Sequence, residues 1–323
     1  MTWLLIAFSM WLAQPTDDDD DVLFDITEIA RGVHAVMREQ IGANGAIVIT
    51  DRDVIVVDSQ SSPAAARALL PRIRKLTDLP IRLVVNTHWH TDHVLGNRAY
   101  LESLPQPFDI VAHAATRRDI SRLGPGLLPA TVRFGRQALE RGRNRLKSEA
   151  FSEVQRSDLT AFLDDYELCL DQLSAADLAV PTMTFEGELT LHRGGQEIRL
   201  VHLGPAHTAG DVVVVLPEER VAMAGDLLTA PRLYADPGAD LNRWLEALRF
   251  LDDKDLAVIV PGHGPLLRGE EHLHRMIAVL ELVLESSDEA SLLERGADLR
   301  PQETDAAAWS AFLRETLAVK DSR

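Results

Sequence analysis

Three histidines and an aspartate lie within six positions of one another in the segment "THWHTDH", residues 87–93. Imidazole and carboxylate groups suit zinc best, and iron and manganese also accept them. In an extended or tightly turned backbone, His88 and His90 can face the same side, whereas Asp92 and His93 are adjacent and their side chains diverge. One tetrahedral ion cannot easily collect all four. The spacing therefore predicts two ions roughly 3.5–4 Å apart, as in two-metal hydrolytic sites.

Two ions need further ligands, and three later segments offer them: "GPAHTAGD" with His207, "MAGDLL" with Asp226 and "VPGHGP" with His263. Each segment follows a strand-like run, and loops at strand ends are where open sites are built. Sorted by geometry, the first ion takes His88, His90 and His207, the second takes Asp92, His93 and His263, and Asp226 bridges them.

The elements that must position these loops alternate between strands and helices. Alternating or continuous apolar runs bounded by Gly, Asp or Pro predict strands, and apolar residues at helical spacing predict helices. Such alternation suggests sheets covered by helices. The expected strands are 32–39, 45–51, 53–60, 81–87, 108–113, 188–192, 197–203, two within 212–228, and 256–265; the expected helices are 62–78, 94–103, 242–253, 269–286 and 303–319.

A helical insertion is predicted from about 114 to 179, and its charge is segregated. Residues 115–150 hold nine Arg and Lys against three acidic residues, and residues 151–177 hold seven acidic residues against one Arg. The two halves either pair with each other in a helical hairpin, which we favour because charged faces are usually just solvated, or the basic half forms a rim that attracts anionic substrates.

Composition narrows the class of partner. The chain has 323 residues and a formal net charge of −17, which argues against a nucleic-acid surface. The partner that we expect is a small-molecule substrate. Cys169 is the only cysteine, so an intramolecular disulfide and a cysteine-rich zinc site are excluded. Lying in the insertion, it is expected to be a small buried apolar residue.

The two ends of the chain differ from its middle. Residues 3–13 are apolar apart from Ser9, too short for a membrane span but long enough for the apolar part of a signal peptide. No Lys or Arg precedes this run, and a buried N-terminal helix is the alternative. We therefore expect a leader with an Asp-rich link over 1–21, periplasmic or secreted if the leader directs export and cytoplasmic otherwise. A catalytic domain is expected over 22–288 and a C-terminal tail with a closing helix over 289–323.

The motifs "THWHTDH", "GPAHTAGD", "AGD" and "PGHGP", in this order and each after a predicted strand, resemble those of the metallo-β-lactamase superfamily. The resemblance covers about residues 25–285. It implies an α/β (α+β) fold, a four-layer αββα sandwich with a dinuclear site at one edge of its two sheets, and it agrees with the ligand sorting above. It also implies that Asp58, in "IVVDSQ", does not bind the metal itself but fixes the orientation of a residue that does.

The chemistry that the resemblance implies is zinc-dependent hydrolysis. Two ions lower the pKa of a shared water, giving a hydroxide nucleophile, and polarise a substrate carbonyl. Asp92 is expected to orient the hydroxide and help move its proton. The bond would be a β-lactam, lactone, thioester or ester. Asp226 stands where one β-lactamase subclass has a cysteine, so the site is closer to those of glyoxalase II and the lactonases.

Three alternatives stay open at this stage. A phosphodiester could be hydrolysed at the same site, a single iron could serve an enzyme resembling the persulfide dioxygenases, or the metal site could be catalytically silent. The other histidines are expected to have structural or surface roles: His34, His192 and His202 inside strands, His113 at the end of a strand, and His272 and His274 exposed on the last long helix.

Overall fold

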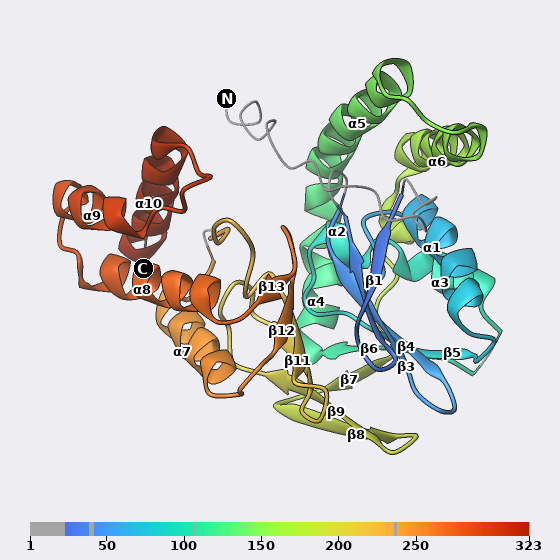
Figure 1. Cartoon of the computed structure of the whole chain (residues 1–323), viewed down its shortest axis with the longest axis horizontal. Coiled ribbons are helices and arrows are strands. Elements are labelled where there is room, and N and C mark those ends of the chain that lie inside the picture. The colour runs from blue at the N-terminus through green and yellow to red at the C-terminus, as the bar shows by residue number, and fades with distance from the viewer. Residues whose placement is uncertain (1–22, 39–41, 106, 236–237, 323) are drawn as a thin grey trace.

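Two β-sheets lie face to face in the computed structural model, which describes residues 23–38, 42–105, 107–235 and 238–322 (Figure 1). Within these residues one sheet has seven strands in the order β1-β2-β3-β4-β5-β6-β7, and the other has six in the order β13-β12-β11-β10-β9-β8. The strands are β1 Asp25–Ala30, β2 Val33–Met37, β3 Gly45–Ile49, β4 Val54–Val57, β5 Ile81–Val85, β6 Asp109–His113, β7 Met183–Phe185, β8 Glu188–Arg193, β9 Gln196–His202, β10 Val212–Leu216, β11 Val221–Gly225, β12 Val258–Pro261 and β13 Leu267–Arg268.

Helices cover the outer faces of both sheets. They are α1 Pro63–Leu76, α2 Thr91–Val94, α3 Asn97–Ser103, α4 Ala114–Arg122, α5 Gly124–Ser148, α6 Glu153–Gln172, α7 Leu241–Asp252, α8 Glu271–Glu285, α9 Glu289–Gly296 and α10 Ala306–Asp321, with short 3₁₀ turns at Ala175–Asp177 and Ala297–Leu299. None of the helices in the described part of the chain combines the length and the apolarity that a membrane crossing requires.

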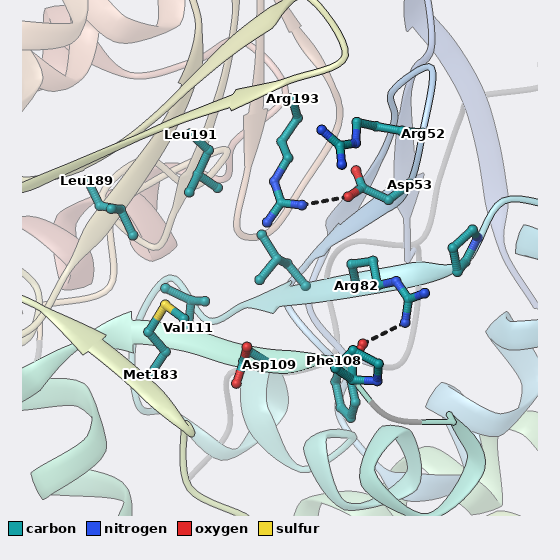
Figure 2. Close-up of a pocket in the computed structure, with 13 residues that line it drawn as sticks. Arg52, Asp53, Arg82, Phe108, Asp109, Val111, Met183, Leu189, Leu191 and Arg193 are labelled. Carbon is teal, nitrogen blue, oxygen red and sulfur yellow. Dashed lines mark hydrogen bonds and ion pairs between the residues drawn. The ribbon is translucent and has the colours of Figure 1, made fainter.

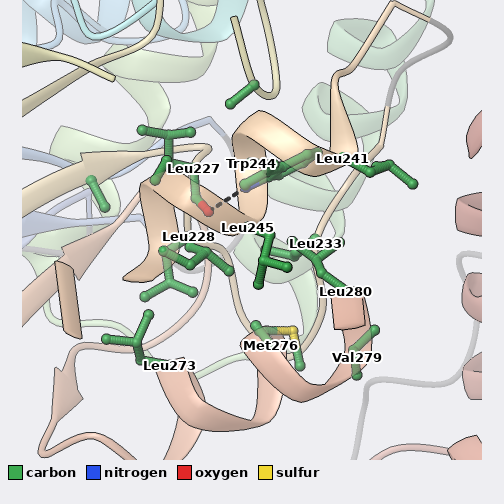
Figure 3. Packing of buried hydrophobic residues seen from close by; sticks show 14 of the residues in the cluster. Leu227, Leu228, Leu233, Leu241, Trp244, Leu245, Leu273, Met276, Val279 and Leu280 are labelled. Carbon is green, nitrogen blue, oxygen red and sulfur yellow. Dashed lines mark hydrogen bonds between the residues drawn. The ribbon is translucent and has the colours of Figure 1, made fainter. Parts of the chain in front are cut away.

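Three apolar clusters hold the layers together. One lies between the sheets and includes Val57, Val85 and Val214, from β4, β5 and β10. A second packs α1 and α3 on the outer face of the first sheet. The third packs α7 and α8 on the second sheet around Trp244, whose indole N–H donates to the Leu227 carbonyl at 2.8 Å (Figure 3). The four-layer αββα fold is therefore confirmed. Helices α9 and α10 extend the third cluster beside α8.

Strand direction decides where the ligand loops meet. β4, β5, β6 and β7 are parallel to one another, and so are β11 and β12. The carboxyl ends of parallel strands open at one edge of a sheet, which is where ligand-bearing loops gather in α/β folds. The four residues of β4 are all buried, as expected for a parallel strand covered on both faces.

A cavity of about 540 Å³ lies at the opposite ends of β5 and β6, between the sheets (Figure 2). Leu189 and Leu191 of β8 face Val111 and Met183 across it. At its rim, Arg193 forms an ion pair with the buried Asp53 at 2.7 Å. No histidine is among the described residues that line this cavity, which separates it from the predicted metal ligands.

The insertion between β6 and β7 is helical, as predicted, with α4, α5 and α6. Arg136 and Arg143 of α5 form ion pairs with Glu167 of α6, and Arg136 also pairs with Asp171. These pairs support the hairpin interpretation of the charge segregation. Cys169 is half-buried beside the Arg67 guanidinium, which lies 3.1 Å from its sulfur.

Some local features differ from the sequence prediction. β1, β13 and α9 were not expected; β1 is half exposed along its length, so no apolar alternation marks it. The helix expected over 94–103 is divided into α2 and α3, because the Gly96 N–H bonds the Gln60 carbonyl at 3.1 Å instead of continuing the helix. The leader and Asp-rich link predicted for 1–21 lie outside the described residues.

Candidate metal centre

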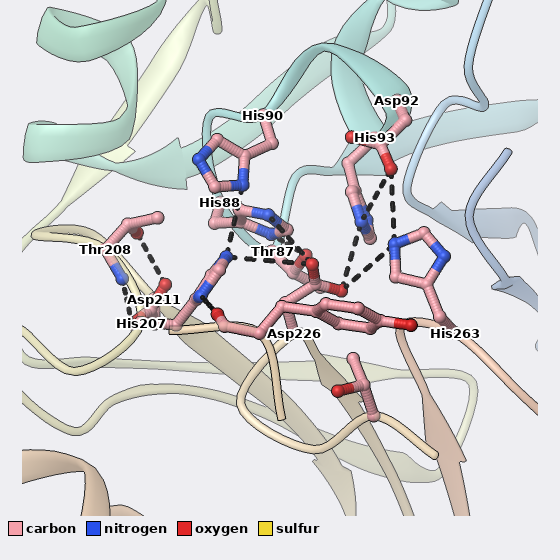
Figure 4. Close-up of polar contacts among 12 residues, drawn as sticks. Thr87, His88, His90, Asp92, His93, His207, Thr208, Asp211, Asp226 and His263 are labelled. Atoms are coloured by element: carbon pink, nitrogen blue, oxygen red, sulfur yellow. Dashed lines mark hydrogen bonds and ion pairs between the residues drawn. The ribbon is translucent and has the colours of Figure 1, made fainter. Parts of the chain in front are cut away.

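All seven predicted ligands lie at one edge of the sandwich (Figure 4). β5 ends at Val85, and the following turn carries His88 and His90; α2 carries Asp92 and His93. The second sheet supplies His207 from the loop between β9 and β10, Asp226 directly after β11 and His263 directly after β12. Loops more than a hundred residues apart in sequence thus meet at one point.

The first group consists of His88, His90, His207 and Asp226, whose ligand atoms lie within 4.8 Å of one another. His207 Nε2 is 3.1 Å from His90 Nδ1. Asp226 Oδ2 is 3.6 Å from His207 Nε2 and 3.8 Å from His88 Nε2. Three nitrogens and one oxygen therefore converge, which is the ligand number of a tetrahedral zinc.

The second group consists of Asp92, His93 and His263, again within 4.8 Å. Asp92 Oδ2 is 3.2 Å from His263 Nε2 and 3.9 Å from His93 Nε2. Asp226 contributes here too, because its Oδ1 is 3.3 Å from His93 Nε2 and 3.5 Å from His263 Nε2. The two oxygens of one buried carboxylate thus face the two groups separately.

Two glycines allow Asp226 to occupy this position. A Cβ on Gly262, the residue before His263, would lie 1.9 Å from Asp226 Oδ1, so only glycine fits there. Gly225 has a φ of +52° and a Cβ on it would lie 2.6 Å from Thr87 Oγ1. The glycines of "AGD" and "PGHGP" therefore serve close packing around the carboxylate. Asn44 fixes the same loop from β3, because its side-chain amide donates to the Pro261 and Gly264 carbonyls.

Hydrogen bonds behind the ligands fix which ring nitrogen faces the centre. Asp58 Oδ2 accepts from His93 Nδ1 at 2.7 Å, as its position after β4 predicted, which leaves Nε2 toward the centre. The Thr87 hydroxyl donates to the same Asp58 oxygen at 2.8 Å and so accepts from His88 Nδ1 at 3.1 Å. Such outer partners raise ligand basicity and hold ring orientation.

The Tyr234 carbonyl holds the His207 ring and Asp211 holds its loop, and the sequence revealed neither contact. His207 Nδ1 donates to the Tyr234 carbonyl at 2.9 Å, from a segment 27 residues away. Asp211 closes the loop, since its carboxylate accepts from the Thr208 N–H and hydroxyl. Burial raises the pKa of Asp211 to about 7, although the Thr208 bonds oppose this shift. "GPAHTAGD" contains Asp211, but a backbone carbonyl leaves no mark in a sequence.

Charge is distributed unequally between the two groups. Burial, together with the neighbouring histidines, holds the pKa of His88 well below its usual value, so this imidazole is neutral. Burial acts in the same sense on His93, but Asp226, Asp58 and Asp92 outweigh it and raise the pKa of His93 to about 10. Burial also opposes the Asp226 charge, yet His263 and His93 lower the pKa of this carboxyl well below its usual range. The carboxylates therefore stay ionised, ready to bind cations.

The donor atoms fit divalent metals. Among the described residues, His88 Nε2, His93 Nε2 and Asp226 Oδ1 are buried without a hydrogen-bond partner, although buried polar atoms are nearly always bonded. All three point into the centre (Figure 4). Nitrogen and oxygen donors without sulfur suit zinc, and also iron or manganese. A metal ion at each group would satisfy these atoms.

The centre opens into a cavity of about 510 Å³. His90, Asp92 and His263 line one side of it, and α5 lines the other. Thr131 of α5 shares a hydrogen bond with Thr91, so the insertion directly adjoins the ligand loop. This volume is in the range of small-molecule sites.

The remaining histidines lie away from both groups. His34, His192 and His202 are in β2, β8 and β9, and His113 at the end of β6 stacks on His202 with 3.7 Å between ring centroids. His274 is exposed on α8 and 2.6 Å from Asp252. The expectation for His272 was wrong: it is half-buried, because its Nε2 bonds the Thr229 carbonyl at 2.9 Å.

Comparison with known proteins identifies the family. The family model described as the metallo-β-lactamase superfamily matches residues 41–263. The chain therefore belongs to this superfamily, and its fold agrees with solved members. A metallo-β-lactamase from Pontibacter korlensis aligns with a TM-score of 0.55 and 22% identity, covering 80% of this chain and 99% of that one. The mono-zinc form of the metallo-β-lactamase FIM-1 from Pseudomonas aeruginosa aligns with a TM-score of 0.56 and 21% identity, covering 85% and 100%.

Curated relatives carry different activities in their names. The chain is 25% identical over 235 residues to a linear primary-alkylsulfatase from Pseudomonas sp. (strain ATCC 19151), covering 69% of this chain and 42% of the relative. It is 26% identical over 216 residues to the alpha subunit of 2,4-dinitroanisole O-demethylase from Nocardioides sp. (strain JS1661), covering 66% and 50%. The chain thus spans half or less of the length of these two relatives.

Proposed function

We propose that the protein is a dinuclear zinc hydrolase that cleaves an acyl bond of a small molecule. The observation that carries the proposal is the position of Asp226, whose two oxygens face two separate histidine groups. A single ion would use only one of these groups. His88, His90 and His207 would hold one ion and Asp92, His93 and His263 the other, with Asp226 shared.

When bound, two such ions supply Lewis acidity and a water of lowered pKa near neutral pH. The chain's own residues would then orient the reaction. Asp92 belongs to the centre and lines the cavity, and its side chain is 39% exposed, so its carboxylate would orient the water and help to move its proton. The Asp58 carboxylate holds the His93 ring and the Tyr234 carbonyl holds the His207 ring, which limits reorganisation during the reaction.

The substrate is a small molecule held between the centre and α5. The size of the cavity and its position beside the ligands support this assignment. Among acyl compounds the proposal includes β-lactams, lactones, thioesters and esters. The names of the relatives add a primary alkyl sulfate and an aryl methyl ether to the compounds that a substrate screen should contain.

The test is turnover of this panel by protein loaded with zinc, with iron and with no metal. We expect hydrolysis of at least one acyl substrate by the zinc form, loss on chelation and recovery on addition of zinc. Activity that requires iron, or turnover of only the sulfate, the ether or a phosphodiester, would overturn the acyl-hydrolase proposal.

A further inference from the structure

The wall of the cavity opposite the metal centre is one face of α5. Leu127, Thr131, Phe134, Ala138 and Arg141 line the cavity at intervals of three or four residues, the spacing of one helix face. The first part of this face is largely apolar, and Phe134 is 52% exposed. Arg141 is the only Arg or Lys among the described residues that line the cavity.

The cations of α5 differ in their partners. Arg136 and Arg143 pair with acidic residues of α6, and Arg145 pairs with Glu149. The Arg133 guanidinium lies 5.0 Å from the centroid of the Phe134 ring. Arg141 is exposed and forms no hydrogen bond or ion pair with any described residue, although it lies two positions from Arg143. Within the described part of the chain, the insertion therefore places at the cavity one guanidinium that no acidic side chain pairs.

Arg141 and the metal centre lie at different ends of the cavity. Thr131 is hydrogen-bonded to Thr91 at the ligand loop, at 2.9 Å. Arg141 follows ten residues later in the same helix, which corresponds to about 15 Å along its axis. Tyr166 of α6 lines the cavity too. Apolar surface thus extends from the metal centre toward a terminal guanidinium.

We propose that the substrate is an acyl compound with an anionic group at the far end of an apolar chain, and that Arg141 binds that group. This inference rests on the proposed function, since it assigns the substrate class of the same centre. The apolar segment packs against Phe134 and Ala138 while the reacting carbonyl lies at the metal ligands. A guanidinium suits this role because its fork of donors matches a carboxylate, phosphate or sulfate.

The kinetic test uses 4-nitrophenyl monoesters of dicarboxylic acids, and matched esters in which a methyl group replaces the distal carboxylate. Hydrolysis adds water across the acyl C–O bond and releases 4-nitrophenol and the carboxylic acid. We expect zinc-loaded wild type to prefer the long anionic decanedioyl ester to its neutral match. Arg141→Gln should lower kcat/KM for this ester about tenfold, the size of one hydrogen bond to a charged group, and leave the neutral ester within about twofold.

The matched control is Arg143→Gln, which removes the same charge from the same helix outside the cavity. It should change neither ester, and the short butanedioyl ester should be insensitive to Arg141→Gln because its carboxylate cannot reach position 141. Equal losses from the two arginine variants would attribute the effect to general charge and overturn the proposal. So would a wild type that does not distinguish the long anionic ester from the neutral one.

A binding measurement separates this inference from the proposed function. Calorimetry with decanedioate and decanoate needs no turnover, and decanedioate should bind wild type about tenfold more tightly than it binds Arg141→Gln. If decanedioate instead bound in the cavity at the opposite end of the sandwich, Arg141→Gln would not change its affinity. Equal affinities would overturn the inference, whereas absence of ester hydrolysis with this difference in affinity retained would overturn only the proposed function.

Discussion

The metal centre and the α5 wall face each other across one cavity and are built in opposite ways. At the centre, His88, His93 and Asp226 are buried, and each of the two rings is held by a hydrogen bond at its Nδ1. On α5, Phe134 and Arg141 are exposed and belong to an insertion between two strands. Ligand loops held rigidly by two sheets can position groups for catalysis. The sequence of an inserted helix can change without disturbing those loops. We infer that the sandwich determines the reaction and α5 the substrate.

The largest effect is expected from Asp226→Asn. The substitution keeps the shape of the side chain but removes the charge that faces both groups. Metal content should fall by about one ion per chain, and kcat/KM should fall on the order of a thousandfold, since metal activation is lost. Mass spectrometry of bound metal and steady-state kinetics measure both. Asp252→Asn, in the exposed pair with His274, is the control and should change neither.

His207→Ala is expected to remove one ion and hydrolytic turnover while the fold is kept. Behind the centre the ring donates to the Tyr234 carbonyl, which belongs to a loop, so its loss does not break a strand. Circular dichroism checks the fold, and metal content checks the site. His274→Ala, on the exposed side of α8, should retain wild-type turnover. Undiminished turnover in His207→Ala would contradict the ligand assignment.

Asp58→Asn should have an intermediate effect. The carboxylate accepts from His93 and Thr87, and an amide retains the shape without the charge. Outer partners of this kind typically contribute about 10–100-fold in metal affinity or activity. Competition with a chelator should therefore reveal weakened zinc binding at unchanged ligand number. Asp53→Asn, the buried aspartate before β4, tests whether loss of any buried carboxylate gives the same result.

Phe134→Ala should have the smallest effect, because half of this side chain is already exposed. Truncation removes apolar surface from the wall of the cavity, and KM for a long-chain acyl ester should rise about three- to tenfold with kcat unchanged. Leu168→Ala, on the exposed face of α6, is the control. A fall in kcat with unchanged KM would show that Phe134 affects the reaction step and not substrate binding. It would contradict the assignment of catalysis to the metal centre and of substrate binding to α5.

The residues that converge at the candidate centre could be predicted from the sequence because each lies in a turn, short helix or loop that follows a strand. Five buried residues of β10 and the apolar end of β5 mark the strands, and His, Asp and Gly interrupt them at the loops. The superfamily membership followed from the order of these motifs. The resemblance implied a ligand-orienting role for Asp58, but that His93 is its partner emerged only from the structure, in which β4 lies beside β5.

The features of the site that could not be predicted from the sequence depend on contacts between distant segments. The Tyr234 carbonyl that orients His207 has no side-chain signature, and the clash that forbids a Cβ at Gly262 arises only when β11 and β12 are adjacent. The charge segregation of the insertion predicted its hairpin. Which face of α5 lines the cavity, and so places Arg141 there without a partner among the described residues, depends on how α5 packs beside α2. The prediction of an exported leader remains a prediction.

The most direct test of the central claim is the metal content of protein purified without added metal and freed of loosely bound ions by gel filtration. The account predicts about two zinc ions per chain in the wild type and about one fewer in Asp226→Asn. One iron per chain, or a single zinc that Asp226→Asn leaves in place, would contradict a centre shared by two ions through this carboxylate.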